Sequence, residues 1–201
     1  MIIFAPETDK DMIITIARQC GCGALEVGKI LAERYGLPLY TRKSLQRAAQ
    51  EKGLLAEMED FFEERPVDEL MSSITFSFER GDVQEKFCRA FRNVVGEGGC
   101  ILIGRCGNFI FRDREDLVSV FLHGDEQTRI RHIMSSEGRK LSDAEEFVRN
   151  TDAARVSYHK FYTGLDWGNA PDYDLCIDVC RLGAENTAAM IEEYAGRLDI
   201  E

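Results

Sequence analysis

The chain has 201 residues, enough for one domain with a sizeable core, and no apolar run approaches the length that crosses a membrane. Its 36 acidic residues outnumber its 25 lysines and arginines, so the formal net charge is −11. Because nucleic-acid polymers and anionic membranes both attract a basic surface, neither is expected as the main partner, whereas a small anion held by local arginines remains possible.

Seven cysteines are scattered along the chain without a Cys-x-x-Cys pair. Their odd number, and an N-terminus without an apolar segment long enough for secretion, predict free thiols in a cytoplasmic protein. Cys20, Cys22 and Cys106 could together hold a metal ion. Their non-standard spacing and the lack of a histidine nearby in the sequence make that interpretation the weaker one.

A short strand, a glycine-bearing loop and an amphipathic helix follow one another between Met12 and Ala32. Residues 12–16 are apolar and β-branched, which indicates a buried strand, and a helical period of apolar residues begins close to Ala24. Between them, glycines let the backbone turn its N–H groups inward, and the helix start adds its own N–H groups and dipole. We therefore expect a phosphate over the backbone N–H groups of residues 20–25, with the binding residues Gly21, Cys22, Gly23, Ala24 and Leu25.

The loop departs from the P-loop pattern Gly-x-x-x-x-Gly-Lys-[Ser/Thr], in which the lysine binds outer phosphates and the hydroxyl binds magnesium. If residues 18–26 (RQCGCGALE) form the loop, Ala24 stands at the lysine position and Glu26 at the Ser/Thr position. A second alignment supplies Lys29 as the lysine but makes residues 24–27, which favour a helix, serve as loop. We favour the first alignment, in which Lys29 is a solvated surface residue.

Later in the chain, short apolar strands alternate with helices. The further strands are expected at residues 37–40, 100–103, 118–122 and 175–179, and the further helices at 41–52, 82–97, 142–158 and 184–197, with another that begins at Asp125 and carries Arg129 and Arg131. Thr41, Asp125 and a Ser142/Glu145 capping box are the expected helix starts. The acidic segment 56–64 reads as a surface helix or mobile flap that ends before Pro66. This alternation predicts an α/β fold, a parallel sheet covered by helices on both faces.

Five segments carry a resemblance to a known family: ITIARQCGCG, AERYGLPLY, ILIGRCGNFIF, TDAARVSYHKFYTGLD, and Trp167-Gly168 followed by YDLCIDV. Together they resemble the cytidylate kinase-like branch of the P-loop nucleoside monophosphate kinases. The resemblance implies a single domain, residues 1–201, with a five-stranded parallel sheet, an inserted acceptor-binding region at about 44–83 and a lid at about 138–167. It also implies ATP and Mg²⁺ as cofactors and a small nucleotide, CMP or dCMP, as acceptor.

The resemblance assigns roles to individual residues. Gly21 and Gly23 match the glycines of the phosphate loop, and Arg105 matches the arginine that holds the acceptor monophosphate, a task that suits a bidentate guanidinium. Asp152 and Arg155 match a lid pair that reaches the acceptor nucleotide.

Each of these roles has a structural alternative. Arg105 could cap the C-terminus of a neighbouring helix, and Asp152 with Arg155 could be an i,i+3 ion pair. His159 has no second histidine at ligand spacing, so a core or tip histidine is expected. Packing is also the expected role of the nearby aromatic residues Tyr158, Phe161, Tyr162 and Trp167.

Four positions depart from the family pattern: Ala24 replaces the lysine, Glu26 the hydroxyl, Ile103 an aspartate before Gly-Arg, and Cys106 the acid after it. The chain therefore lacks the usual protein ligand of magnesium and the usual loop cation. Both matter, because phosphoryl transfer depends on positioning and charge neutralisation.

Another cation is expected to replace the loop lysine, since backbone N–H groups alone would leave a triphosphate poorly compensated. Arg18, two residues beyond the strand, is the candidate, and with Arg105 and Arg155 it completes the expected catalytic set. The other possible donors are Lys29 and the arginines Arg129, Arg131 and Arg155, of which Arg129 and Arg131 are also possible phosphate contacts. Arg18 could instead point to solvent or pair with a carboxylate.

Two functions from different classes remain. One is an ATP-dependent phosphotransferase acting on a nucleoside monophosphate or another small acceptor. The other is a catalytically silent nucleotide-binding or regulatory module that kept the phosphate cradle and lost the lysine.

Overall fold

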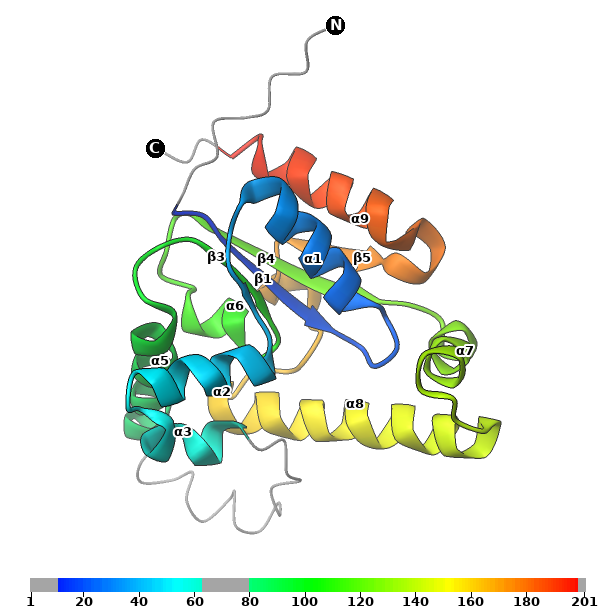
Figure 1. Ribbon diagram of the computed structural model, residues 1–201, viewed down its shortest axis with the longest axis horizontal. Helices are drawn as coiled ribbons and strands as arrows, with labels where there is room; N and C mark the ends of the chain where they lie inside the picture. The colour runs from blue at the N-terminus through cyan, green and yellow to red at the C-terminus, as the bar shows by residue number, and fades with distance from the viewer. Residues whose placement is uncertain (1–10, 63–79, 199–201) are drawn as a thin grey trace, which may run out of the picture.

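Five short strands pair in parallel to form one sheet in the order β2-β3-β1-β4-β5 (Figure 1). The computed structural model describes residues 11–62 and 80–198, so the expected break at Pro66 and part of the expected insertion lie outside the described residues. The five-stranded parallel sheet expected from the sequence is confirmed. Its strands are β1 (Ile13–Arg18), β2 (Leu39–Tyr40), β3 (Cys100–Ile103), β4 (Leu117–His123) and β5 (Leu175–Asp178).

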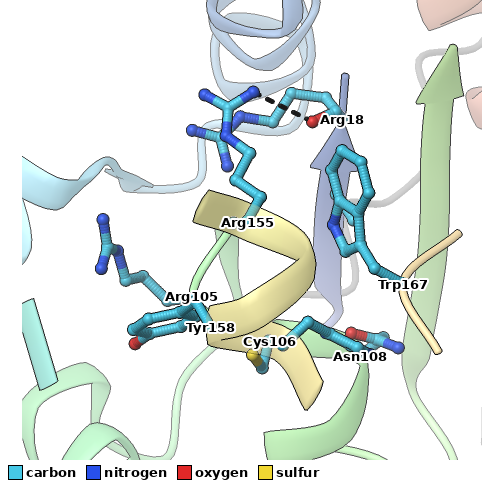
Figure 2. A pocket seen from close by; sticks show the side chains of 10 residues that line it. Arg18, Arg105, Cys106, Asn108, Arg155, Tyr158 and Trp167 are labelled. Atoms are coloured by element: carbon cyan, nitrogen blue, oxygen red, sulfur yellow. Dashed lines mark hydrogen bonds between the residues drawn. The ribbon is translucent and has the colours of Figure 1, made fainter. Parts of the chain in front are cut away.

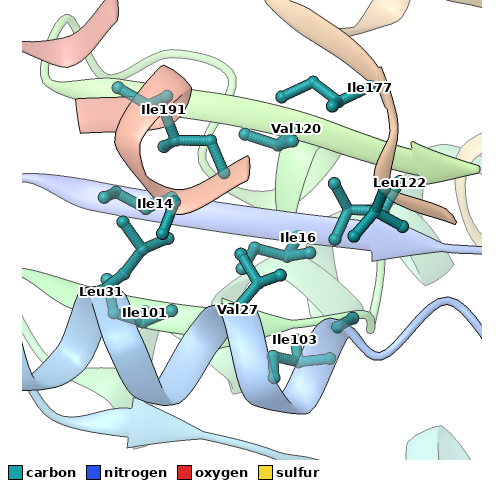
Figure 3. Close-up of a cluster of buried hydrophobic side chains, with 14 of the residues drawn as sticks. Ile14, Ile16, Val27, Leu31, Ile101, Ile103, Val120, Leu122, Ile177 and Ile191 are labelled. Carbon is teal, nitrogen blue, oxygen red and sulfur yellow. The ribbon is translucent and has the colours of Figure 1, made fainter. Parts of the chain in front are cut away.

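Helices α1 (Ala24–Tyr35) and α9 (Val179–Ala195) cover one face of the sheet. Figure 3 shows Val27 and Leu31 of α1 packed against Ile14 and Ile16 of β1, and all four side chains are fully buried. Burying side chains of this size contributes about 1.5–3 kcal/mol each. This packing fixes the start of α1 directly beyond the end of β1, where the glycine loop lies.

The other face is covered by α5 (Arg80–Val95) and α6 (Gly107–Ile110), with α2 (Arg42–Glu51) and α3 (Leu55–Phe62) beside them. Phe87 and Phe91 of α5 are fully buried, as their helical spacing predicts. The segment expected to be a surface helix or flap forms α3, and its Met58 and Phe62 are buried in this core. The many acidic residues of this segment made its single apolar face hard to recognise in the sequence.

Helices α7 (Glu126–Glu137) and α8 (Leu141–Thr163) form a third layer at the carboxyl end of β1. The two helices pack against each other through a small apolar cluster, which also contains Cys20 of the loop. The Ser142/Glu145 capping box is wrong: α8 begins at Leu141, after a Lys140 that makes no side-chain cap, so Ser142 lies inside the helix. Most of residues 138–167, expected as a lid, is therefore one continuous helix that runs from α7 toward α3 (Figure 1).

Helix α9 starts earlier than expected but is interrupted. Gly183 has non-helical backbone angles (φ 75°, ψ 166°), so one short turn precedes the helix that was expected from residue 184. None of the described helices combines the length and the apolar character needed to cross a membrane.

Candidate functional site

The loop after β1 begins a helix at the residue that the favoured alignment requires. Gly23 is the N-cap of α1 in the left-handed conformation (φ 65°, ψ 22°), and Ala24 is the first helical residue. Residues 24–27 are helical, so they cannot serve as the loop of the second alignment. Lys29 is exposed on α1 and is absent from the described residues that line the groove at the loop.

The N–H groups of this loop form an open cradle. Within residues 11–62 and 80–198, the backbone N–H groups of Gly21, Gly23, Ala24 and Leu25 have no hydrogen-bond acceptor in the protein. Only Cys20 of the expected set is strongly engaged, since its N–H donates to the Asp152 carboxylate at 2.7 Å. Unpaired N–H groups at a helix start are the donors that an anion requires.

Side chains from α7 and α8 bind three carbonyls at the end of β1 and in the loop. Arg155 donates to the Arg18 carbonyl at 3.2 Å, Arg129 to the Cys20 carbonyl at 3.0 Å, and the His132 Nδ1–H to the Gly21 carbonyl at 2.9 Å. The peptide unit of the Cys20 carbonyl also carries the Gly21 N–H, so the bond from Arg129 helps to present that N–H inward. The N–H groups of the other two units, those of Gln19 and Cys22, donate to the carbonyls of Leu122 and Gln19. Side chains of α7 and α8 therefore fix part of the loop backbone.

A buried ion pair anchors the same arrangement. Arg129 and Asp152 are 2.8 Å apart, with only 8% and 19% of their side chains exposed, and Arg129 also donates to the Gly124 carbonyl at 3.0 Å. Arg155 approaches the other Asp152 oxygen at 3.8 Å, which is the i,i+3 pair considered above. In the structure, Arg129 and Asp152 thus bind the Cys20 backbone and pair with each other beside the loop.

Gly21 allows the loop to lie directly against α7. A Cβ at this position would lie 2.5 Å from the Arg129 backbone oxygen, and the φ of 83° is in the left-handed region. Only glycine satisfies both conditions without displacing backbone.

A groove extends from the loop across the start of α2 to α7 and α9. Its lining includes the loop residues 18–26, the first residues of α2, and Gly183 at the break of α9. Four cationic side chains border it: Arg18, Arg42, Lys43 and Arg155. These cations outnumber the carboxylates of the described residues that line the groove, Glu26 and Glu137, although the whole chain is acidic.

A second, smaller cavity adjoins the groove, and Arg18 and Arg155 line both. Figure 2 shows Arg155 extending from α8 toward the backbone of Arg18, with Trp167 across from it. Arg18 packs against Gly104 so closely that a Cβ there would collide with its guanidinium. The expected position of Arg18 beside the phosphate loop is therefore compatible with the structure.

Arg105 lies at the carboxyl end of β3, as expected, and lines this second cavity. It is 95% buried and donates to the carbonyls of Phe61 and Phe62, the last residues of α3, at 3.3 and 3.2 Å. The Tyr158 hydroxyl donates to the same Phe61 carbonyl at 2.6 Å, and the Arg105 guanidinium lies 5.1 Å from the Tyr158 ring centre (Figure 2). In this structure Arg105 therefore caps a helix C-terminus, the structural alternative considered above.

The turn that carries Arg105 is strained. Gly104, Arg105 and Cys106 all have positive φ angles, of 76°, 57° and 55°. For the two residues that bear a Cβ, this conformation costs about 1 kcal/mol or more each. Such strain persists where the surroundings fix a side chain in a required place, here Arg105 at the wall of the cavity.

The aromatic residues near the end of α8 pack as expected. Phe87 stacks on Tyr162 with ring centres 4.3 Å apart, and Trp167 meets the edge of Phe121 at 5.2 Å. His159 is 97% buried, and burial lowers its pKa to about 4, so it is a neutral core histidine at physiological pH.

All seven cysteines are free. Burial raises the pKa of the Cys22 thiol to about 12, and its hydrogen-bond partner is Cys180 rather than Cys106. No three His, Cys, Asp or Glu side chains of the described segments gather as a metal site would require. A preformed cysteine metal centre therefore has no support in this part of the chain.

Sequence reasoning missed His132, Arg42 and Lys43, which border the cradle from α7 and α2. It also included Arg131, which donates to Thr128 on the surface of α7 and is not among the described residues lining either cavity. Both errors have the same cause: contacts between helices that are distant in the sequence determine which residues reach the site. The capping pattern at Thr41, which does place Arg42 and Lys43 at a helix start, was the only available signal.

Comparisons with known proteins agree with this architecture. A model of the cytidylate kinase-like family matches residues 13–181. The cytidylate kinase of Methanopyrus kandleri is 24% identical over 191 residues, covering 90% of this chain and 91% of that protein. The crystal structure of an uncharacterized protein from Eubacterium ventriosum is 26% identical, with a TM-score of 0.70, over 92% of this chain and 99% of that one.

A gluconokinase from Sinorhizobium meliloti, at 16% identity and a TM-score of 0.51, shares the fold over 94% of this chain and 95% of its own. The sheet order and the loop after β1 are those of a P-loop kinase fold. The chain belongs to the cytidylate kinase-like family.

Proposed function

We propose that this protein transfers the γ-phosphoryl group of ATP to a small acceptor, with a nucleoside monophosphate of the cytidylate type as the first acceptor to test. One observation carries the proposal. The open N–H cradle and the arginine-lined cavity adjoin, and the same two guanidinium groups, Arg18 and Arg155, border both. A phosphoryl group moving from one site to the other would pass beside them.

These arginines supply what the transfer needs. The transferred group carries negative charge on its equatorial oxygens, and catalysis consists mostly of positioning and charge stabilisation. Guanidinium groups stay protonated and bind such oxygens in a bidentate manner. Arg18 thus takes the place of the missing lysine, and Arg155 assists it from α8.

Arg105 would complete the acceptor side. Its guanidinium already reaches the cavity wall, and its strained turn holds it there. Because it also caps α3, a phosphate bound by Arg105 would be linked directly to the position of that helix.

Mg²⁺ would neutralise charge on the outer phosphates when bound with the nucleotide. The described residues contain no cage of three ligating side chains. This fits Mg²⁺, which protein sites commonly hold through one or two carboxylates, water and the substrate phosphates. Two carboxylates of the described residues line the groove, Glu26 and Glu137, and Glu26 belongs to the first turn of α1.

The second candidate, a nucleotide-binding module without turnover, is favoured by a single observation. Ala24 is a buried methyl group at the position where the alignment requires a lysine. Binding of a nucleotide is common to both candidates, so only turnover separates them.

The deciding experiment is an ADP-release assay with ATP, Mg²⁺ and a panel of nucleoside monophosphates. Acceptor-dependent release of ADP supports a kinase, and saturable ATP binding without release on any acceptor supports the silent module. In parallel, ATP affinity is measured for Arg18→Ala and Lys29→Ala. We expect a loss of tenfold or more, about 1.4 kcal/mol, for Arg18→Ala alone. The same loss confined to Lys29→Ala would refute the role of Arg18.

A further inference from the structure

We propose that Glu26 is the protein ligand of a divalent cation that enters the site with the nucleotide, and that it weakens the binding of metal-free nucleotide. This inference rests on the proposed binding of a nucleotide at the loop. Glu26 replaces the Ser/Thr hydroxyl that usually binds magnesium, and the proposal assigns cation binding to its carboxylate instead.

Glu26 stands at the right place for this role. It is in the first turn of α1 and lines the groove at the cradle. Its Oε2 atom lies 4.0 Å from the point that a Cβ of Gly23 would occupy, so the carboxylate reaches back over the helix start. Ala24 and Leu25, its neighbours in that turn, carry no oxygen in their side chains. Whatever the details of the alignment, Glu26 is thus the only side-chain oxygen ligand among residues 24–26.

The Glu26 carboxylate is also chemically available. It makes no hydrogen bond or ion pair with the residues that the structure describes, and it is exposed. Glu137, the other acid among the described residues that line the groove, pairs with Arg139 at 2.6 Å, and Asp152, outside the groove, binds the Cys20 N–H and Arg129. The Glu26 carboxylate is therefore available to a cation that arrives with a nucleotide.

A capping role explains less. A glutamate at the third helical position often accepts the N–H of the N-cap residue. Here no such bond forms, since the Gly23 N–H has no acceptor among the described residues. The carboxylate leaves the cradle N–H groups open instead of filling them.

Electrostatics then gives the site a particular behaviour. A carboxylate and a polyphosphate in one groove repel each other, and that repulsion is strongest where water is partly excluded. A divalent cation that Glu26 held together with the nucleotide would reverse the sign of this interaction. Glu26 should therefore weaken the binding of free ADP and strengthen the binding of its magnesium complex.

The test measures ADP affinity by titration calorimetry, with Mg²⁺ and with EDTA, for the natural protein and for Glu26→Gln. For the natural protein, Mg²⁺ should tighten ADP binding about tenfold or more. For Glu26→Gln, affinity in EDTA should rise about threefold or more, and the Mg²⁺ effect should shrink to about twofold. Glu26→Thr, which restores a hydroxyl, should bind ADP in EDTA as well as Glu26→Gln does but keep more of the Mg²⁺ effect.

Glu33→Gln is the matched control, because Glu33 is exposed on the same helix away from the groove and the change in charge is equal. It should leave both affinities unchanged. A Glu26→Gln protein with the full Mg²⁺ effect, or with equal losses in both conditions and a lower melting temperature, would overturn the role of Glu26 while leaving nucleotide binding intact. Failure of the natural protein to bind ADP in either condition would overturn the proposed function itself.

Discussion

The buried pair Arg129–Asp152 offers the sharpest test of how the phosphate loop is held. In Asp152→Asn, the amide oxygen can still accept the Cys20 N–H, but the charge opposite Arg129 is lost. Removing one partner of a buried ion pair costs about 3–5 kcal/mol. Asp152 is 19% exposed and Arg129 keeps its bonds to the carbonyls of Cys20 and Gly124, so we expect about 2–3 kcal/mol.

For a chain of this size, each kcal/mol lowers the melting temperature by about 2–4 °C, so a decrease of about 5–10 °C is expected. Urea unfolding followed by circular dichroism measures the free energy directly. Glu146→Gln, an exposed substitution on the same helix, is the control and should change it by less than about 0.5 kcal/mol. If Asp152→Asn is as stable as that control, the ion pair does not anchor the loop and the argument from its burial is wrong.

Three further predictions concern other parts of the site. Gly104→Ala should lower the free energy of unfolding by about 1–2 kcal/mol because of the positive φ at this position, and the new methyl group should displace the Arg18 guanidinium. ATP affinity, measured by calorimetry, should therefore fall as we expect for Arg18→Ala. Unchanged affinity would show that Arg18 does not bind ATP from this position. Arg105→Ala should lower the melting temperature by uncapping α3 and weaken acceptor binding more than ATP binding, whereas equal losses of both affinities would mark a purely structural arginine. Burial lowers the pKa of His159 from 6.5 in the unfolded chain to about 4, so the unfolded state binds more protons than the folded state between these pH values. The stabilising contribution of the neutral histidine should therefore be complete above pH 6.5, and the free energy of unfolding should decline toward pH 4 by up to about 1.4 kcal/mol per pH unit. His159→Gln should flatten that slope in urea titrations.

Local patterns predicted most of the fold. The apolar run before Gly21, the period of α1 and the cap at Thr41 each depend on neighbours in the sequence, and each was found within a few residues of its expected place. The helix start at Ala24 also decided between the two loop alignments. Errors occurred where a local pattern competed with packing, as when the capping box at Ser142 was preferred to a start at Leu141.

The site was less predictable, because its contacts join distant segments. The sequence indicated that Arg105 follows a strand, but its direction depends on three successive left-handed residues and on carbonyls of α3, more than forty positions away. The bond from His132 to Gly21 spans 111 positions. Neither contact leaves a short-range signal, so resemblance could name Arg105 as a site residue but could not show that it caps a helix.

Helix α8 connects the two proposed substrate sites, because it contacts both the phosphate loop and the end of α3. Asp152 and Arg155 bind the phosphate loop, and Tyr158, less than two turns further along, binds the end of α3. Because α8 is one uninterrupted helix, a displacement at one end is transmitted along its axis to the other end. A shift of α3 on acceptor binding would therefore be felt at the loop, and filling the loop would stiffen α3. Each substrate should bind more tightly in the presence of the other, a synergy with equal magnitude in both directions.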